Sequence, residues 1–295
     1  MTLAVGGRPV KIEHSREESM IGSRTRHAFK FKLRTGVSKE GKLIATHIKL
    51  ISNSGAYASH GHSIAMSAGS KFRALYNFKA IKFDPITVYT NLPVAGAMRG
   101  YGAPQIHYAL ECHVENIVRE LKLDPLEFRK QNFAGVGYED ALTGLKTLTN
   151  GVSECVDRGQ ELINWASKKA KYTSQTGEKR RGLGMACFAY LSGTHPVSIE
   201  IAGARIVLNQ DGTVQLQIGA TEIGQGSDTV FAQIVAETIG IEFEKVHVIS
   251  TQDTDISPFD TGSYASRQTY VTGMAVKKAA DEVRAKILDF TWGMT

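Results

Sequence analysis

Three glycine-containing loops stand directly before segments whose apolar residues recur at helical spacing. They read AMRGYGAPQ at 97–105, GATEIGQGSD at 219–228 and DTGSYASRQ at 260–268. The first turn of a helix has unpaired N–H groups and the positive end of the helix dipole, and glycine or serine lets a ligand approach the backbone closely. The pattern predicts anion binding, although a single glycine loop before a helix is more often an ordinary turn.

Two polar side chains in these loops suit an anionic ligand. Arg99 carries a planar fork of donors that fits phosphate or a metal-bound oxygen. Gln225 stands between two glycines and can offer its amide to a ligand without a bulky neighbour. Several such loops together suit a long, polyanionic cofactor better than one phosphate group.

Two further groups have the residue types of metal sites but not the spacing. His60 and His62 are an i, i+2 pair, yet no acidic residue or cysteine lies at ligand spacing from them. Asp253 and Asp255, with Asp260 nearby, depart from the EF-hand pattern, which favours a solvated turn. We therefore expect no side chain of this chain to bind a metal directly.

The elements around these loops predict an α+β protein. Alternating apolar and polar residues predict a strand at 8–15, a hairpin over 29–58 that turns at SKEGK, and a further strand at 81–92, whereas 60–78 is ambiguous. Helical spacing follows at 106–122, and 134–151 reads as a linker. A second helix is predicted over 151–172, with Val156, Leu162, Ile163 and Trp165 on its apolar side.

The second half repeats this plan. Two strands over 204–220 are joined by NQDG, a strong hairpin turn. A helix follows, with Ser227 or Asp228 as its expected N-cap and Val230, Ile234, Val235 and Ile239 as its apolar face. A strand at 244–251 and a helix at 269–288 complete the predicted order.

Composition limits the classes of function. The chain has 295 residues, 42% of them hydrophobic, and a net charge of +6 whose basic residues are scattered. This favours a solvated basic surface, or a dock for an acidic partner, over nucleic-acid binding. No run of about 18 apolar residues predicts a membrane span, and residues 1–19 do not read as a secretory signal. Cys112, Cys155 and Cys187 are far apart, as expected of reduced thiols in the cytoplasm.

The three loops occur in an order that resembles the molybdenum hydroxylase family. TNLPVAGAMRGYGAPQ is followed by GATEIGQGSDTVFAQIVAETIGI and then by STQDTD and TGSYASRQTYVTGMAV, and the chain is most similar to the molybdenum-binding subunits of bacterial xanthine dehydrogenases. GRPVKIEHSREESMIGSRTRH near the start fits the same branch. The resemblance implies two molybdopterin-binding subdomains of mixed sheets with helices, at 1–140 and 150–295, the first partial at its N-terminus and the second at its C-terminus.

The resemblance also implies a cofactor and its contacts. The cofactor is molybdopterin, either alone or as its cytosine dinucleotide, and the protein gives its metal no side-chain ligand. Tyr101 matches a position at which purine-oxidising relatives stack an aromatic ring on the substrate, and Thr194 and His195 would border the substrate channel. A substrate-orienting arginine would fall at 67–69, where the chain has SAG, and Arg73 is offset, so purine specificity stays open. The implied cofactor-binding residues are Arg99, Gly100, Gly224, Gln225, Gly226, Ala265 and Ser266.

Two segments of the family are not found in these residues. The catalytic base is a glutamate in a GVGEPP-like segment, and a GGFGGK-like loop contributes to the cofactor site; neither is present, and Glu222 matches a different motif position. We therefore expect the middle of a catalytic subunit, inactive by itself.

The complete enzyme would hydroxylate purines or related N-heterocycles and pass electrons through 2Fe-2S clusters and FAD on partner subunits to NAD. The partners would be an iron–sulfur subunit, a FAD subunit and a chain carrying the rest of the molybdenum domain, in a homo-oligomeric complex. Three alternatives stay open: a non-catalytic fragment, a hydroxylase of aldehydes, nicotinate or aromatic CoA esters, and a phosphate-binding module unrelated to molybdenum.

Overall fold

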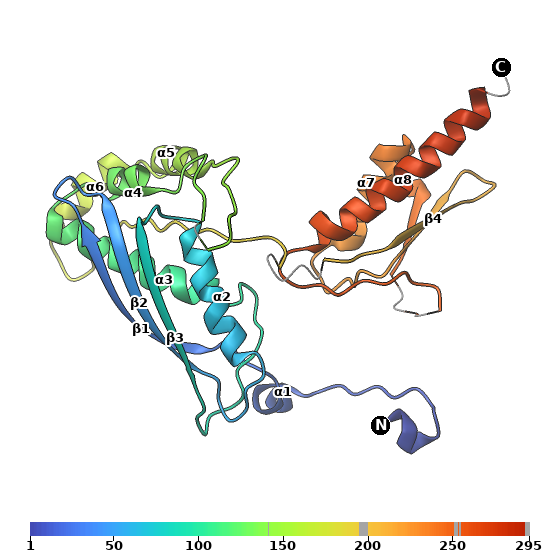
Figure 1. Ribbon diagram of the computed structural model, residues 1–295, viewed down its shortest axis with the longest axis horizontal. Coiled ribbons are helices and arrows are strands. Elements are labelled where there is room, and N and C mark those ends of the chain that lie inside the picture. The colour runs from blue at the N-terminus through green and yellow to red at the C-terminus, as the bar shows by residue number, and fades with distance from the viewer. Residues whose placement is uncertain (141, 195–199, 251–252, 254, 293–295) are drawn as a thin grey trace. The chain divides into compact units, whose positions relative to one another are not determined.

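The chain folds into two compact units, Met1–Tyr190 and Leu191–Thr295. The structure is a computed structural model, and it describes residues 1–140, 142–194, 200–250, 253 and 255–292. Each unit contains a three-stranded mixed sheet with helices packed against it (Figure 1). The α+β prediction is therefore confirmed, whereas the division at 140–150 into two cofactor-binding subdomains stays a prediction.

The predicted hairpin forms the sheet of the first unit. Strands β1 (Ala28–Val37) and β2 (Leu43–Asn53) are antiparallel, and Ser38 N–H donates to the Lys42 carbonyl at 2.9 Å across the turn. Strand β3 (Ala80–Val88) lies parallel to β2. A parallel pair needs a crossover connection, and helix α2 (Gly61–Arg73) supplies it from the segment that was ambiguous in sequence.

Helix α3 (Ala103–Leu121) packs on the same sheet and confirms the predicted apolar spacing. Ile106, Leu110 and Val114 are at most 1% exposed and belong to the core that includes Ile48 of β2 and Phe72 of α2. Helix α4 (Pro125–Asn132) follows, with the Asp124 carboxylate accepting from two of its first N–H groups. The core thereby fixes the start of α3, and with it the first glycine loop.

Two sequence predictions in this unit are wrong. Residues 8–15 are no strand, because they have no partner strand; a 3₁₀ helix η1 (Thr2–Val5) and the short helix α1 (Arg16–Gly22) flank them. The helix expected over 151–172 is broken into α5 (Val152–Leu162) and α6 (Trp165–Thr173) at Asn164, whose φ is 53°. Leu162, the last residue of α5, is 83% exposed, whereas Val156 and Trp165 are buried as predicted.

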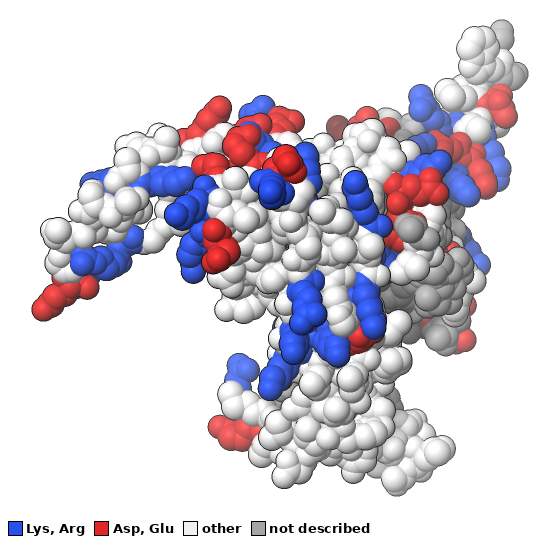
Figure 2. Space-filling view, turned by 60° about the vertical axis from the view of Figure 1, so that its left-hand side comes forward, with Lys and Arg blue, Asp and Glu red and all other residues white. Residues whose placement is uncertain are grey.

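The outer face of the first sheet is basic. Lys30, Lys32 and Arg34 of β1 and Lys49 of β2 are exposed there, and the strand register places Lys32 opposite Lys49. Figure 2 shows Lys and Arg side chains gathered on the face turned toward the viewer. Strand pairing therefore collects charges that are scattered along the sequence.

The second unit repeats the order of the first. Strands β4 (Ala204–Leu208) and β5 (Val214–Ile218) form the predicted hairpin, and helix α7 (Ser227–Ile239) with the 3₁₀ turn η2 (Phe243–Lys245) crosses over to β6 (Val246–Ile249), which is parallel to β5. Helix α8 (Gln268–Trp292) ends it. Both units thus run hairpin, crossover helix, parallel strand, loop, helix. Within the described ranges, no helix has the length and apolar character needed to cross a membrane.

Candidate cofactor-binding loops

The first loop presents the guanidinium of Arg99 to solvent. Arg26 holds the backbone in place, since its Nη2 donates to the Arg99 carbonyl at 2.7 Å and its Nη1 to the Gln105 side chain at 3.4 Å. Arg99 itself is exposed, and its side chain has no hydrogen bond or ion pair with any described residue. An exposed cation held on a braced backbone is ready to bind an anion.

Glycine is required where this loop joins α3. Gly102 is the N-cap of the helix with φ 93°, and a Cβ there would stand 2.8 Å from the Ile64 carbonyl oxygen of α2. Gly100 has φ 94°. Both positions therefore favour glycine, and the first turn of α3 begins in direct contact with the backbone of α2.

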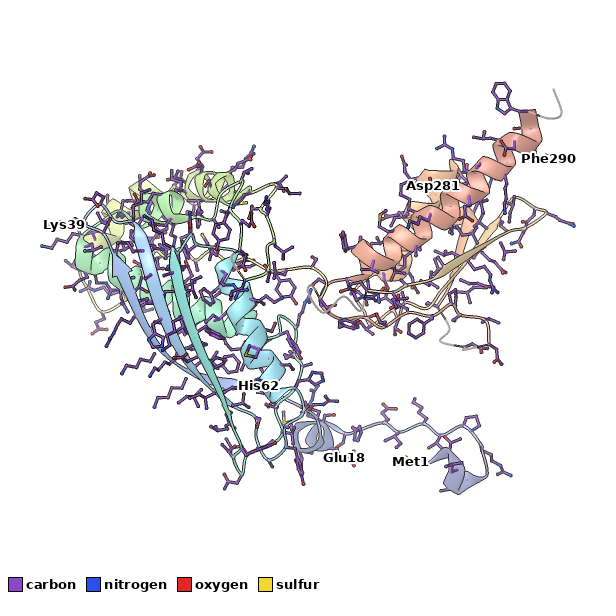
Figure 3. All side chains as sticks on the ribbon, viewed as in Figure 1. Met1, Glu18, Lys39, His62, Asp281 and Phe290 are labelled. Carbon is purple, nitrogen blue, oxygen red and sulfur yellow. The ribbon has the colours of Figure 1, made fainter. Side chains whose placement is uncertain are left out.

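Tyr101, between these glycines, has φ 44°, a left-handed conformation that is unusual for a residue with a side chain. Its hydroxyl lies 2.8 Å from Nδ1 of His60 and 2.8 Å from Oγ of Ser63. His62 does not take part; Figure 3 labels it beside the N-terminal end of α2. In the part of the chain that the structure describes, no three His, Cys, Asp or Glu side chains gather as a metal site.

The carboxylate of Glu222 organises the second loop. Its oxygens accept from the N–H groups of Gly224 at 2.6 Å and Gly226 at 3.1 Å, and from Ser227 Oγ and Asp228 N at 3.2 and 3.3 Å. These donors, with that of Gly226 the most important, lower the pKa of Glu222 to about 2. The predicted cap is wrong: Gly226 is the N-cap of α7, and Glu222, not Ser227 or Asp228, satisfies its first N–H groups.

The side chain of Gln225 is folded onto this loop. Its Nε2 donates to the Thr221 carbonyl at 3.1 Å and to Ser227 Oγ at 3.0 Å, while its Oε1 accepts from Ile223 N–H. Gly224 and Gly226 have φ of 94° and 85°, and a Cβ on either would meet nothing within 4 Å. The loop therefore offers open space over its backbone, whereas the Gln225 amide is engaged within the loop and would have to give up one of these contacts to bind a ligand.

A buried arginine holds the third loop. Ala265 and Ser266 both have left-handed φ, 49° and 52°. The next residue, Arg267, has a fully buried side chain that donates to Glu200 at 2.6 Å, to Asp260 at 2.7 Å and to the backbone carbonyls of Gly262 and Ile201. All three nitrogens of the guanidinium are thus hydrogen-bonded, which fixes the loop ahead of α8.

The same network includes one of the predicted substrate-channel residues. Thr194 donates to the Glu200 carboxylate from both its backbone N–H and its hydroxyl, and Gly193 N–H donates to the Ala265 carbonyl at 2.8 Å. His195 lies outside the described residues. Ser263 Oγ donates to the Thr221 carbonyl at 2.7 Å, so the second and third loops are neighbours.

The structure therefore forms two groups of site residues. Arg99, Gly100 and Tyr101 share the first loop, and Thr194, the Gly224–Gly226 loop and Ala265–Ser266 are joined in the second unit. Sequence reasoning missed the residues that support them, because no local pattern marks a partner dozens of residues away. These supporting residues are Arg26, His60, Ser63, Glu200 and Arg267.

The donors present fit an anionic cofactor. Arg99 has an unpartnered guanidinium among the described residues, and the backbone of Gly224 and Gly226 is open to close approach. A phosphate-bearing, ring-containing group needs both features: charged donors for its oxygens and bare backbone beside its rings.

Comparison with known proteins agrees with these features. The family described as Molybdopterin cofactor-binding domain matches the chain twice, at residues 1–133 and 158–294. The xanthine dehydrogenase molybdenum-binding subunit of Escherichia coli O157:H7 is 49% identical over 288 residues, which are 98% of this chain and 38% of that protein. The xanthine dehydrogenase/oxidase of Gallus gallus is 29% identical over 95% of this chain and 21% of that protein.

A solved structure shares the fold. The aldehyde oxidoreductase of Desulfovibrio gigas superposes with a TM-score of 0.82 at 26% identity, over 95% of this chain and 30% of that chain. The chain thus spans well under half the length of the relatives it matches. With molybdopterin cofactor-binding domains matched in both halves and the fold shared, the chain belongs to the molybdenum hydroxylase family, as a molybdopterin-binding part.

Proposed function

We propose that this chain binds molybdopterin for an enzyme that hydroxylates purines or related N-heterocycles. The observation that carries the proposal is the exposed guanidinium of Arg99, which has no partner among the described residues, on a loop that also holds Tyr101. The 49% identity to a xanthine dehydrogenase subunit supports the heterocyclic substrate class. Whether the cofactor carries a cytosine nucleotide does not change these assignments.

Each site residue has a role in this proposal. Arg99 binds an oxygen of the cofactor, and Gln225 hydrogen-bonds it from the second loop. Gly100, Gly224 and Gly226 leave the backbone bare for close approach, as do the small residues Ala265 and Ser266. Molybdopterin supplies the metal that accepts electrons from the substrate, while this chain positions the reactants and stabilises charge.

Substrate contacts belong to other residues. Tyr101 stacks its ring on a planar substrate, and Thr194 and His195 border the channel. The general base is a glutamate outside these 295 residues, because no GEPP-like segment is present in them.

The enzyme is a cytoplasmic complex in this proposal. The matched E. coli protein is described as a subunit, which supports an iron–sulfur subunit and a FAD subunit as partners, with a chain that carries the rest of the molybdenum domain and a homo-oligomeric assembly. Cys112, Cys155 and Cys187 are all free thiols, as expected in a reducing compartment.

A related hydroxylase of aldehydes is the second candidate. The superposition on an aldehyde oxidoreductase favours it, as does the absence of an arginine at 67–69. Steady-state rates of the assembled enzyme on hypoxanthine and on an aromatic aldehyde separate the two substrate classes.

The proposal is tested by removing the Arg99 guanidinium. A charge-assisted hydrogen bond contributes roughly 1.5 to 3 kcal/mol, so Arg99→Ala in the assembled enzyme should lower molybdenum and pterin content at limiting cofactor. Elemental analysis measures the metal, and fluorescence of the oxidised pterin measures the organic part. Arg34→Ala, on the exposed face of β1, is the matched control. Equal cofactor content in the two variants would remove Arg99 from the site.

A further inference from the structure

We propose that His60 and Ser63 are positioning residues that hold the hydroxyl of Tyr101, so that Tyr101 meets a substrate with the face of its ring and not with its hydroxyl. The hydrogen bonds belong to the chain itself, and the effect on substrate rests on the proposed function. His60 and Ser63, at the start of α2, therefore become supporting residues of the site.

His60 Nδ1 and the two hydroxyls can each be donor or acceptor, and one arrangement of their hydrogen atoms satisfies every contact of this cluster. Ser63 Oγ donates its hydrogen to the His60 carbonyl at 3.0 Å. Its oxygen is then left to accept the Tyr101 hydroxyl hydrogen at 2.8 Å. The Tyr101 oxygen in turn accepts from His60 Nδ1–H at 2.8 Å. The hydroxyl of Tyr101 has no hydrogen left to donate to a substrate.

The backbone restricts Tyr101 as well. Its left-handed φ of 44° lies between two glycines of positive φ, and Gly102 is in contact with the backbone of α2. The imidazole of His60 stands edge-on to the phenol ring, with centroids 5.9 Å apart and planes at 85°. Tyr101 is therefore held at its hydroxyl and at its backbone, with the imidazole in a T-shaped contact with its ring.

The second unit supports this arrangement independently. There the loop before the crossover helix α7 is hydrogen-bonded to the loop before α8, through Thr221 and Ser263. In the first unit the start of α2, with its N-cap His60 and with Ser63, contacts the loop before α3 through Tyr101. Each unit thus joins the same two loops.

The experiment is a mutant cycle in the assembled enzyme, with hypoxanthine as substrate. His60→Ala/Ser63→Ala and Tyr101→Phe should each raise KM by roughly 2- to 10-fold, the range of one net hydrogen bond, with kcat and molybdenum content unchanged. Adding both alanines to Tyr101→Phe should raise KM no further. His62→Ala, an exposed neighbour in the same segment, should match the parent. A further rise in the triple variant would show that His60 and Ser63 act elsewhere.

A second readout does not need turnover. With 3-fluorotyrosine at position 101, ¹⁹F NMR should give one resonance in the parent and in His62→Ala, and two or a broadened one in His60→Ala/Ser63→Ala, because the ring is released. An unchanged spectrum in the double variant overturns the positioning role itself. If the spectrum changes while KM does not, the hydrogen bonds to Tyr101 are confirmed and its contact with the substrate is overturned.

Discussion

Glu222 satisfies the helix N-terminus that its sequence motif assigns to a ligand. Its carboxylate takes the N–H groups of Gly224, Gly226 and Asp228, so these donors hold the loop and do not face outward. Because these hydrogen bonds already order the loop, less conformational entropy would be lost when a cofactor binds beside it. In the proposed function, Glu222 would therefore act on the cofactor only indirectly, by ordering the glycines beside it.

The low pKa of Glu222 makes the order of the loop depend on pH. A carboxyl whose folded pKa is about 2, against an ordinary 4.5, stabilises the fold above pH 4.5 and loses that contribution as pH falls toward 2. We expect Glu222→Gln to lower the hydrogen-exchange protection factors of the Gly224, Gly226 and Asp228 amides at pH 7. Between pH 7 and pH 3 these protection factors should change less in Glu222→Gln than in the parent. Glu237→Gln, at an exposed position of α7, should have the same protection factors as the parent.

Arg267 is the second residue on which a loop depends. Its removal leaves the fully buried carboxylate of Asp260 without its cation. Breaking a buried pair from one side costs roughly 3 to 5 kcal/mol. Arg267→Ala should lower the free energy of unfolding by that amount in urea titrations, whereas Arg205→Ala on the exposed strand β4 should change it little. If Arg267→Ala lowers the free energy of unfolding as little as Arg205→Ala does, water replaces the Arg267–Asp260 ion pair.

At the scale of elements, one supersecondary plan occurs twice and positions every loop. The hairpins β1–β2 and β4–β5 each lead through a crossover helix to a parallel strand, and the next loop ends at α3 or α8. Helix α2 packs near α3, and α7 packs near α8. The segments that lead into these helices therefore meet in each unit.

Helix α5 gives a prediction on stability. Val156 is 2% exposed and Leu162 83% exposed within this one helix, because six residues of helix place two side chains about 120° apart around its axis. Val156→Ala should cost about 2 kcal/mol of unfolding free energy, and Leu162→Ala under about 0.5 kcal/mol. Thermal or urea unfolding of the two variants measures the difference; similar losses would mean that Leu162 also packs in the core.

At the scale of the whole molecule, two cores lie in two compact units. Val214, Leu216 and Phe231 are fully buried in the second, without residues of the first among their cluster. Cofactor-binding families match both halves. Each unit therefore supplies its own loops from its own core.

A polypeptide of residues 1–295 alone should not hydroxylate hypoxanthine, nicotinate or an aromatic aldehyde with an artificial electron acceptor. Loss of a general base costs about 10²- to 10⁴-fold in rate, and these residues include no GEPP-like glutamate. Co-expression with segments that carry the GGFGGK-like and GEPP-like motifs should restore molybdenum binding and then turnover. Turnover by residues 1–295 that Glu222→Gln abolishes would identify Glu222 as the base.

Sequence by itself determined the two hairpins, the helices α3, α7 and α8, the glycine loops and the family, because hydrophobic period and turn chemistry depend on neighbouring residues. Only the tertiary structure decided which distant side chains meet. His60 lies 41 positions from Tyr101 and Glu200 lies 67 from Arg267, and strand register alone sets Lys32 opposite Lys49. Such pairs depend on how separate elements pack, and a local pattern carries no record of that packing.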